Sequence, residues 1–167
     1  GLGDVYKRQN LNNIMHKVLM VCLGNICRSP LAQGILETIS KKNNFPIHVD
    51  SAGTGNWHSG SAPDKRSIEV AKKYGIDISQ QKARQFSTED FKKFHKIYAM
   101  DTQNYRDLLR LCSNEEECNK VALILNVLNK EERLSVPDPY YGGKDGFENI
   151  YRLLYSACEK IVADFTK

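Results

Sequence analysis

The amino-acid sequence predicts an α/β fold, a doubly wound, four-stranded parallel sheet with helices on both faces. Short apolar runs alternate along the chain with longer amphipathic stretches, which is the pattern of strands joined by crossover helices. The first run, 17–23, is almost continuously apolar, which is typical of a strand buried on both faces of a parallel sheet. Ligands of such sheets bind beyond the carboxyl ends of the strands, where the strand order reverses.

Each expected element has a local signal. Strands are predicted at the short apolar runs 17–23, 46–50, 96–100 and 121–125. Helices are predicted where apolar residues recur at helical spacing, at 29–42, 63–74, 88–94, 101–111 and 147–165. Ser29 is expected to cap the first helix, with Pro30 in its first turn. Small or turn-forming residues indicate loops at 51–61 and 137–144.

Length and composition indicate one globular domain. The first 14 residues are polar and show no periodicity, so we expect a non-native or disordered extension at 1–14 and a single domain over 15–167. No apolar stretch approaches the ~20 residues that cross a bilayer. The net charge of +4 is mild and spread along the chain. We therefore expect a cytoplasmic protein that binds neither membranes nor nucleic acid.

The chain has five cysteines, an odd number, without the spacing of metal ligands. We expect reduced thiols, one of them catalytic, and neither a metal nor another cofactor.

The segment that follows the first strand carries the candidate chemistry. Five residues separate Cys22 from Arg28, and Ser29 and Pro30 then open a helix. Loop N–H groups and a helix N-terminus form a concave binding site for a tetrahedral dianion such as phosphate. The positive electrostatic potential of these groups also favours a thiolate over a thiol. The planar guanidinium group of Arg28 can bind two phosphoryl oxygens at once. The alternative is a buried strand cysteine beside a surface arginine, which the tight order of Gly24, Arg28, Ser29 and Pro30 disfavours.

Two motifs carry a family resemblance. The segment VCLGNICRSP at 21–30 and the segment DPYYG at 138–142 resemble the signatures of the low-molecular-weight protein tyrosine phosphatases, in the same order along the chain. The resemblance runs from about His16 to the end. It implies the phosphotyrosine protein phosphatase I-like fold with a flavodoxin-like strand order. It also implies that tyrosine-phosphorylated proteins and small aryl phosphates are hydrolysed by a monomer or weak homodimer, through a phosphocysteine intermediate.

Three residues are predicted to perform the reaction. Cys22 is the nucleophile, Arg28 stabilises the charge on the transferred group, and Asp138 is the general acid and then the general base. Asp138 lies between two prolines, which stiffen its backbone. The alternative is that Asp138 only begins a turn, a common role of Asp-Pro.

Further residues are predicted to shape the site. Those expected to bind phosphate or support its loop are Leu23, Gly24, Asn25, Ile26, Cys27, Ser29 and Ser51. Asn25 suits a left-handed loop conformation, and Ser29 can donate to the Cys22 thiolate, cap the helix, or do both. Aromatic walls are expected from Trp57, Tyr140 and Tyr141, with His58 tuning substrate choice. The resemblance also implies reversible oxidation of Cys22 with Cys27, although from spacing alone Cys27 is as readily a packed thiol.

Two other functions remain open at this point. A thioredoxin-coupled arsenate reductase of the same fold also uses Cys-x5-Arg and relays oxidation through two more cysteines, for which Cys112 and Cys118 are candidates. The DPYYG motif favours the phosphatase. A non-catalytic phosphopeptide-binding module would lack the nucleophile or the acid, and both are present.

Overall fold

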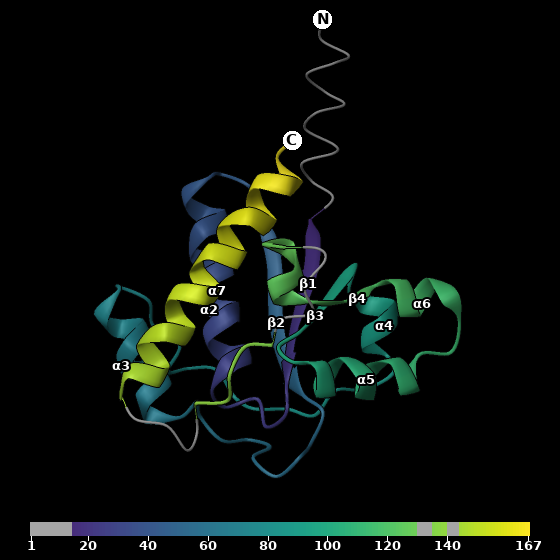
Figure 1. The fold of residues 1–167 in the computed structure, drawn as a ribbon, viewed down its shortest axis with the longest axis horizontal. Coiled ribbons are helices and arrows are strands. Elements are labelled where there is room, and N and C mark those ends of the chain that lie inside the picture. The colour runs from purple at the N-terminus through teal and green to yellow at the C-terminus, as the bar shows by residue number, and fades with distance from the viewer. Residues whose placement is uncertain (1–14, 130–134, 140–143) are drawn as a thin grey trace, which may run out of the picture.

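A four-stranded parallel sheet is the centre of the molecule (Figure 1). The computed structural model describes residues 15–129, 135–139 and 144–167. The strands are β1 (His16–Cys22), β2 (Ile47–Gly53), β3 (Lys96–Ala99) and β4 (Val121–Leu123), and they lie in the order β2-β1-β3-β4. The predicted fold class and flavodoxin-like order are confirmed. The extension predicted at 1–14 lies outside the described residues.

The strand order reverses at β1. The chain places β2 on one side of β1 and then crosses to place β3 on the other side. Cys22 ends β1 opposite Gly53 of β2, and the Met100 N–H donates to the Val21 carbonyl at 2.9 Å just beyond β3. The loop after Cys22 therefore opens at the topological switch point, where ligands of this architecture bind.

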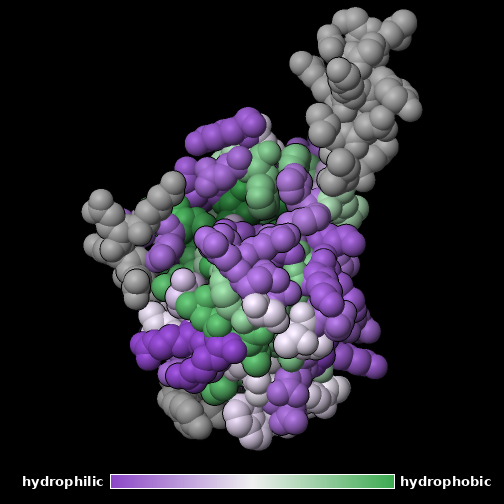
Figure 2. Space-filling view, turned by 90° about the vertical axis from the view of Figure 1, so that its right-hand side faces the viewer, coloured by the Kyte–Doolittle hydropathy of each residue, from purple (hydrophilic) through white to green (hydrophobic). Residues whose placement is uncertain are grey.

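Helices cover both faces of the sheet (Figure 1). One face carries α2 (Arg28–Lys42), α3 (Lys65–Lys73), α7 (Lys144–Phe165) and the 3-10 helix η1 (Ile124–Val127), and the other carries α4 (Asp90–Lys93), α5 (Thr102–Leu111) and α6 (Glu115–Asn119). On the side of α4 to α6, hydrophilic side chains cover most of the surface (Figure 2). Two apolar clusters lie beneath these layers because successive strand residues point to opposite faces: Val18 and Met20 toward α2 and α7, Leu19 and Val21 toward α5.

Most predicted elements are confirmed within a few residues, and four differences affect the site or its surroundings. The second strand extends to Gly53, because the small residues from Ser51 onward pair with the end of β1. The fourth strand ends at Leu123 and continues as η1, and the short helix α6 was not predicted. The prediction that Ser29 caps the first helix is wrong, since α2 begins at Arg28 and Cys27 is its N-cap without a capping side chain.

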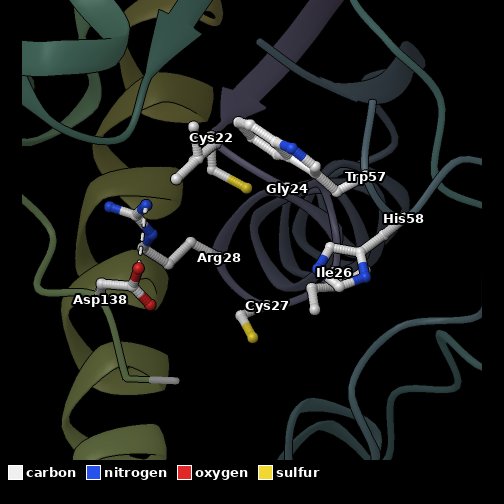
Figure 3. Close-up of a pocket in the computed structure, with 9 residues that line it drawn as sticks. Cys22, Gly24, Ile26, Cys27, Arg28, Trp57, His58 and Asp138 are labelled. Carbon is white, nitrogen blue, oxygen red and sulfur yellow. Dashed lines mark ion pairs between the residues drawn. The ribbon is translucent and has the colours of Figure 1, made fainter. Parts of the chain in front are cut away.

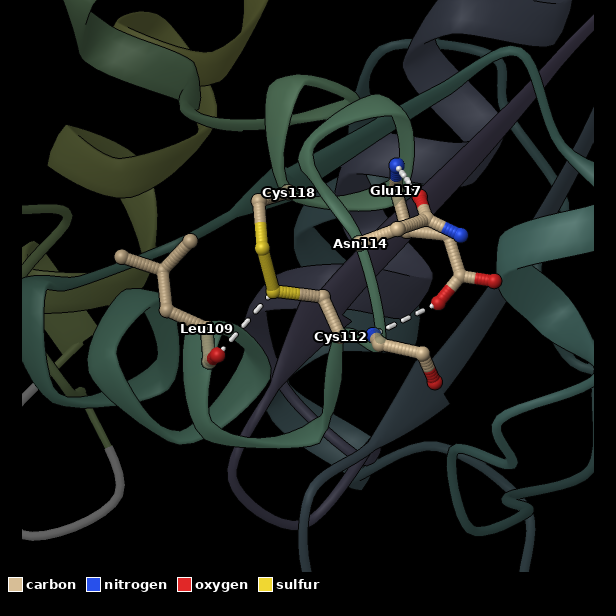
Figure 4. Close-up of a disulfide and its surroundings, with 6 residues drawn as sticks. Leu109, Cys112, Asn114, Glu117 and Cys118 are labelled. Atoms are coloured by element: carbon tan, nitrogen blue, oxygen red, sulfur yellow. Dashed lines mark hydrogen bonds between the residues drawn. A yellow bond between two sulfur atoms is a disulfide. The ribbon is translucent and has the colours of Figure 1, made fainter.

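The prediction that all five cysteines are reduced is also wrong. Cys112 and Cys118 form a disulfide with their Cα atoms 5.4 Å apart (Figure 4). The chain turns back through α6 directly after α5 ends, which brings the two side chains together. The free cysteines among the described residues are Cys22, Cys27 and Cys158, all buried.

We predict that replacing both residues of this disulfide by serine lowers the melting temperature under non-reducing conditions. A loop of this length gives about 2 kcal/mol in the chain-entropy model, or a decrease of roughly 4–8 °C in Tm for a domain of this size. Differential scanning calorimetry measures the change. As the control, reductant should lower the Tm of the unsubstituted protein to that of the Cys112→Ser/Cys118→Ser variant. Equal Tm values without reductant would contradict a stabilising disulfide.

Candidate active site

A cavity of about 230 Å³ opens at the carboxyl end of β1 (Figure 3). Three chain segments meet there: the loop after β1, the loop after β2 and the segment before α7. Its lining consists of Cys22, Leu23, Gly24, Ile26, Cys27, Arg28, Trp57, His58 and Asp138. All nine are among the residues that the sequence predicted for the site.

Cys22 lies at the base of this cavity with its sulfur among hydrogen-bond donors. The backbone N–H of Asn25 donates to Cys22 Sγ at 3.3 Å, and Ser29 Oγ lies 3.0 Å from the same sulfur. Helix α2 begins at Arg28 with neither a capping side chain nor an acidic residue in its first turn. Its first N–H groups and the positive end of its dipole therefore remain available to an anion.

A polar network determines which way the Ser29 proton points. Asn25 has a φ of 57°, the left-handed conformation predicted for it, and the backbone N–H of Arg84 donates to Asn25 Oδ1 at 3.0 Å. Because that N–H can only donate, Asn25 Nδ2 faces the other way and donates to Ser29 Oγ at 2.8 Å and Ser51 Oγ at 2.9 Å. The Ser29 oxygen thus accepts from Asn25, which leaves the Ser29 proton available to Cys22 Sγ at 3.0 Å. A hydrogen bond donated in this direction favours a thiolate.

Arg28 is buried beside Cys22. Its Nη1 donates to Asp101 Oδ2 at 2.6 Å and to the Val136 carbonyl at 3.1 Å, and its Nη2 lies 3.9 Å from Asp138 Oδ2. Burial lowers the pKa of Arg28, but the negative groups around it, chiefly Cys22 and Asp101, leave the pKa above its ordinary value. The guanidinium remains a cation, and its Nε and Nη2 donors can bind two phosphoryl oxygens.

Asp138 reaches the cavity from a segment that is anchored on both sides. The N–H of Val136 donates to the Met100 carbonyl at 2.7 Å, and Pro139 is buried. The Asp138 side chain is half-exposed at the cavity edge, across the site from Trp57 (Figure 3). A carboxyl group in this place can exchange protons with both a bound ligand and water.

The loop after β2 supplies the wall of the cavity that faces Asp138. Trp57 is 71% exposed, and its ring lies over Gly55, where any side chain would collide with it. The His58 ring lies beside Gly24, where a Cβ would come within 3.0 Å of its Cδ2. The predicted aromatic residues Tyr140 and Tyr141 lie outside the described residues.

Cys27 lines the cavity without facing Cys22. Its sulfur is directed away from that of Cys22 (Figure 3). Burial, together with the nearby Asp64 carboxylate, raises the pKa of Cys27 to about 12, so it is a thiol at neutral pH. Within the described part of the chain, no group of three or more His, Cys, Asp or Glu side chains could hold a metal ion. The helices described there also include none long and apolar enough to span a membrane.

Residues 17–167 match the family model of the low molecular weight phosphotyrosine protein phosphatases. The chain belongs to this family. A family member from Schizosaccharomyces pombe is 44% identical over 138 residues, which cover 81% of this chain and 87% of that protein. A protein tyrosine phosphatase from Entamoeba histolytica has a TM-score of 0.85 at 36% identity, covering 90% of this chain and 97% of that one. A Drosophila arginine phosphatase has a TM-score of 0.83 at 32% identity, covering 90% and 98%.

Three residues of this phosphatase family member support the site without having been predicted from the sequence. Asp101 holds Arg28, Arg84 orients Asn25, and Gln33 accepts a hydrogen bond from the Ser51 hydroxyl at 2.8 Å. Of these three residues, Asp101 is the one that a local sequence pattern could have indicated as part of the site. It directly follows a predicted strand, at the edge of the sheet where ligands bind.

We predict that Asp101→Asn weakens the binding of inorganic phosphate about tenfold, because a hydrogen bond between two charged groups is lost from Arg28. Asparagine caps helices as well as aspartate does, so α5 keeps its N-terminal cap. Isothermal titration calorimetry measures the dissociation constant without depending on turnover.

The matched control is Asp107→Asn, on the same helix, where the carboxylate pairs with the exposed Arg110. It should leave phosphate binding unchanged. Equal or tighter binding by Asp101→Asn would show that Asp101 does not position the guanidinium.

Proposed function

We propose that this protein hydrolyses phosphotyrosine and small aryl phosphate monoesters, with Cys22 as nucleophile and Asp138 as general acid and base. The observation that carries the proposal is the position of the Cys22 sulfur. It accepts from the loop N–H of Asn25 and lies 3.0 Å from Ser29 Oγ in the first turn of α2. The Arg28 guanidinium and the Asp138 carboxyl group line the same cavity. Family membership supports the same reaction.

The reaction proceeds in two displacements. The Cys22 thiolate attacks phosphorus, the P–O bond to the leaving group breaks, and Asp138 gives its proton to the leaving oxygen. Arg28 and the loop N–H groups stabilise the charge on the three phosphoryl oxygens. Asp138 then takes a proton from the water that attacks the phosphocysteine. Cys22 leaves as a thiolate, which the Ser29 hydroxyl stabilises.

The cavity walls favour an aryl group. Leu23, Ile26 and the exposed Trp57 provide apolar surface above the concave phosphate-binding site. The Drosophila relative is described as an arginine phosphatase, so phosphoarginine is the comparison substrate that matters. We expect the phosphotyrosine peptide to have the higher kcat/KM, because a guanidinium would lose hydration against these apolar walls.

The arsenate reductase interpretation needs cysteines near the nucleophile. Helix α5 begins next to Asp101 at the site and runs for 10 residues, or about 15 Å, before Cys112. The Cys112–Cys118 disulfide therefore lies toward the opposite edge of the sheet. This position disfavours a relay of oxidation from Cys22.

We further propose that the protein works in the cytoplasm as a monomer or weak homodimer, and that peroxide reversibly inactivates it. Peroxide would oxidise the Cys22 thiolate to a sulfenic acid, and the Cys27 sulfur would then attack it, forming a disulfide and releasing water. Cys22 reacts first because Cys27, with its pKa of about 12, stays protonated. The loop must rearrange, since the two sulfurs point in different directions (Figure 3).

Trapping cellular thiols with acid and an alkylating agent, followed by peptide mapping, tests the oxidation of Cys22. A Cys22–Cys27 crosslink should form only after peroxide treatment. Persistent sulfinic acid on Cys22 without a crosslink would contradict the resolving role of Cys27.

The catalytic roles predict different losses for different substrates. Cys22→Ser should abolish turnover of both a phosphotyrosine peptide and p-nitrophenyl phosphate. Asp138→Asn should lower kcat/KM for the peptide, which reports the first displacement alone, by roughly 10²–10⁴-fold, the range of general acid catalysis. Its effect on p-nitrophenyl phosphate should be smaller, because nitrophenolate leaves readily without a proton.

Steady-state kinetics with purified protein checks these values, and the exposed Asp77→Asn serves as the control with unchanged kcat. An inactive wild-type protein that still binds phosphotyrosine peptides would favour the binding module. Equal losses of kcat/KM on both substrates in Asp138→Asn would contradict the general acid role.

A further inference from the structure

Arg84 occupies a place outside the cavity but is tied to it through its backbone. Its segment lies beside the end of β2, where the Gly53 N–H donates to the Arg84 carbonyl at 2.8 Å and the Phe86 N–H donates to the Gly53 carbonyl at 2.7 Å. The cavity lining does not include Arg84. The residue therefore cannot act on a ligand there directly.

The Arg84 side chain joins two carboxylates from separate elements. Its Nε and Nη2 donate to Asp50 Oδ2 of β2 at 3.1 and 3.0 Å. Its Nη1 and Nη2 donate to the two Asp90 oxygens of α4 at 3.0 and 3.1 Å, in the paired geometry that only a guanidinium provides. Asp90 is buried, and Asp50 and Arg84 are partly exposed.

The Arg84 guanidinium at the centre of these contacts keeps its charge. Burial lowers the pKa of Arg84, but the hydrogen bonds and charges of Asp90 and Asp50 outweigh burial and raise the pKa above its ordinary value. Asp90 also accepts from the Ser87 N–H at 2.9 Å, so five hydrogen bonds, four from the Arg84 side chain and one from Ser87, hold this segment. The Arg84 N–H is thereby fixed in space as well.

That N–H has one partner in the network, the Asn25 side-chain oxygen. If the segment moved, the Asn25 amide could turn over and present its oxygen to Ser29. The Ser29 proton would then point to Asn25 and no longer to the Cys22 sulfur.

We propose that Arg84 is a positioning residue for the nucleophile: its side chain, clamped by Asp50 and Asp90, fixes the backbone donor that orients Asn25, and Asn25 directs the Ser29 proton to Cys22. The inference deepens the proposed function, since it concerns how the same sulfur is kept ionised. A role in stability alone would lower the melting temperature without changing the ionisation of Cys22.

The test is the rate of Cys22 alkylation by iodoacetamide as a function of pH, measured in the free protein by peptide mass spectrometry. For Arg84→Ala we expect the midpoint of the pH profile to rise by about one unit, the effect of losing one hydrogen bond to a charged sulfur. Arg84→Lys keeps the charge but not the paired geometry, so its midpoint should lie between those of Arg84→Ala and the wild type.

Leu108→Ala is the matched control for lost stability. Leu108 is fully buried on the same face of the sheet as Phe86 and Phe91 and makes no bond in the network. It should lower the melting temperature and leave the alkylation midpoint unchanged. A wild-type profile in Arg84→Ala would overturn the proposal. If Arg84→Ala does not fold, an unshifted profile in Arg84→Lys would overturn it. Because no substrate takes part, an inactive wild type would refute the proposed function without affecting this result.

Discussion

The need to surround the buried Cys22 sulfur with hydrogen-bond donors is the constraint on which the proposed function depends. An isolated charge is costly to bury, and the cost falls only when donors are already aimed at it. Cys22 meets the Asn25 N–H, the Ser29 hydroxyl and the start of helix α2, with the Arg28 cation beside it. The same donors suit a phosphoryl group, so one arrangement serves both the nucleophile and its substrate.

The fold provides these donors from elements that are far apart in the sequence. Parallel strands bring their carboxyl ends to one edge, so β2 supplies Ser51 and the end of β3 leads to Asp101 at that edge. Gly53 lets β2 approach the catalytic loop, because a Cβ there would lie 2.7 Å from the Leu23 carbonyl. The rigid sheet thus holds the loop from one side and the network around Asn25 holds it from the other.

The strand, loop and helix around Cys22 could be predicted because their signals are local: an apolar run, a fixed spacing to Arg28, and a helix start. The residues that support them could not, because Asp101 and Arg84 lie 73 and 59 positions from their partners in the loop. Either could be an ordinary surface charge until the fold places it.

Ser29 shows a different limit of prediction from sequence. A serine at a predicted helix start can be the N-cap or can donate a hydrogen bond to a nearby sulfur. Because α2 begins at Arg28, one residue before Ser29, the Ser29 hydroxyl does not cap the helix and lies beside Cys22 Sγ. The Cys112–Cys118 pair was missed because the short helix α6 that closes it has no apolar periodicity.

We propose that the Cys22 sulfur is ionised in the free, folded protein at neutral pH. The difference in ultraviolet thiolate absorbance between the wild type and Cys22→Ser, followed across pH, tests this proposal most directly. Cys27 does not interfere, because burial raises its pKa to about 12. We expect a thiolate signal that is already complete at neutral pH and disappears on acidification. A signal that develops only at strongly alkaline pH would contradict the proposal.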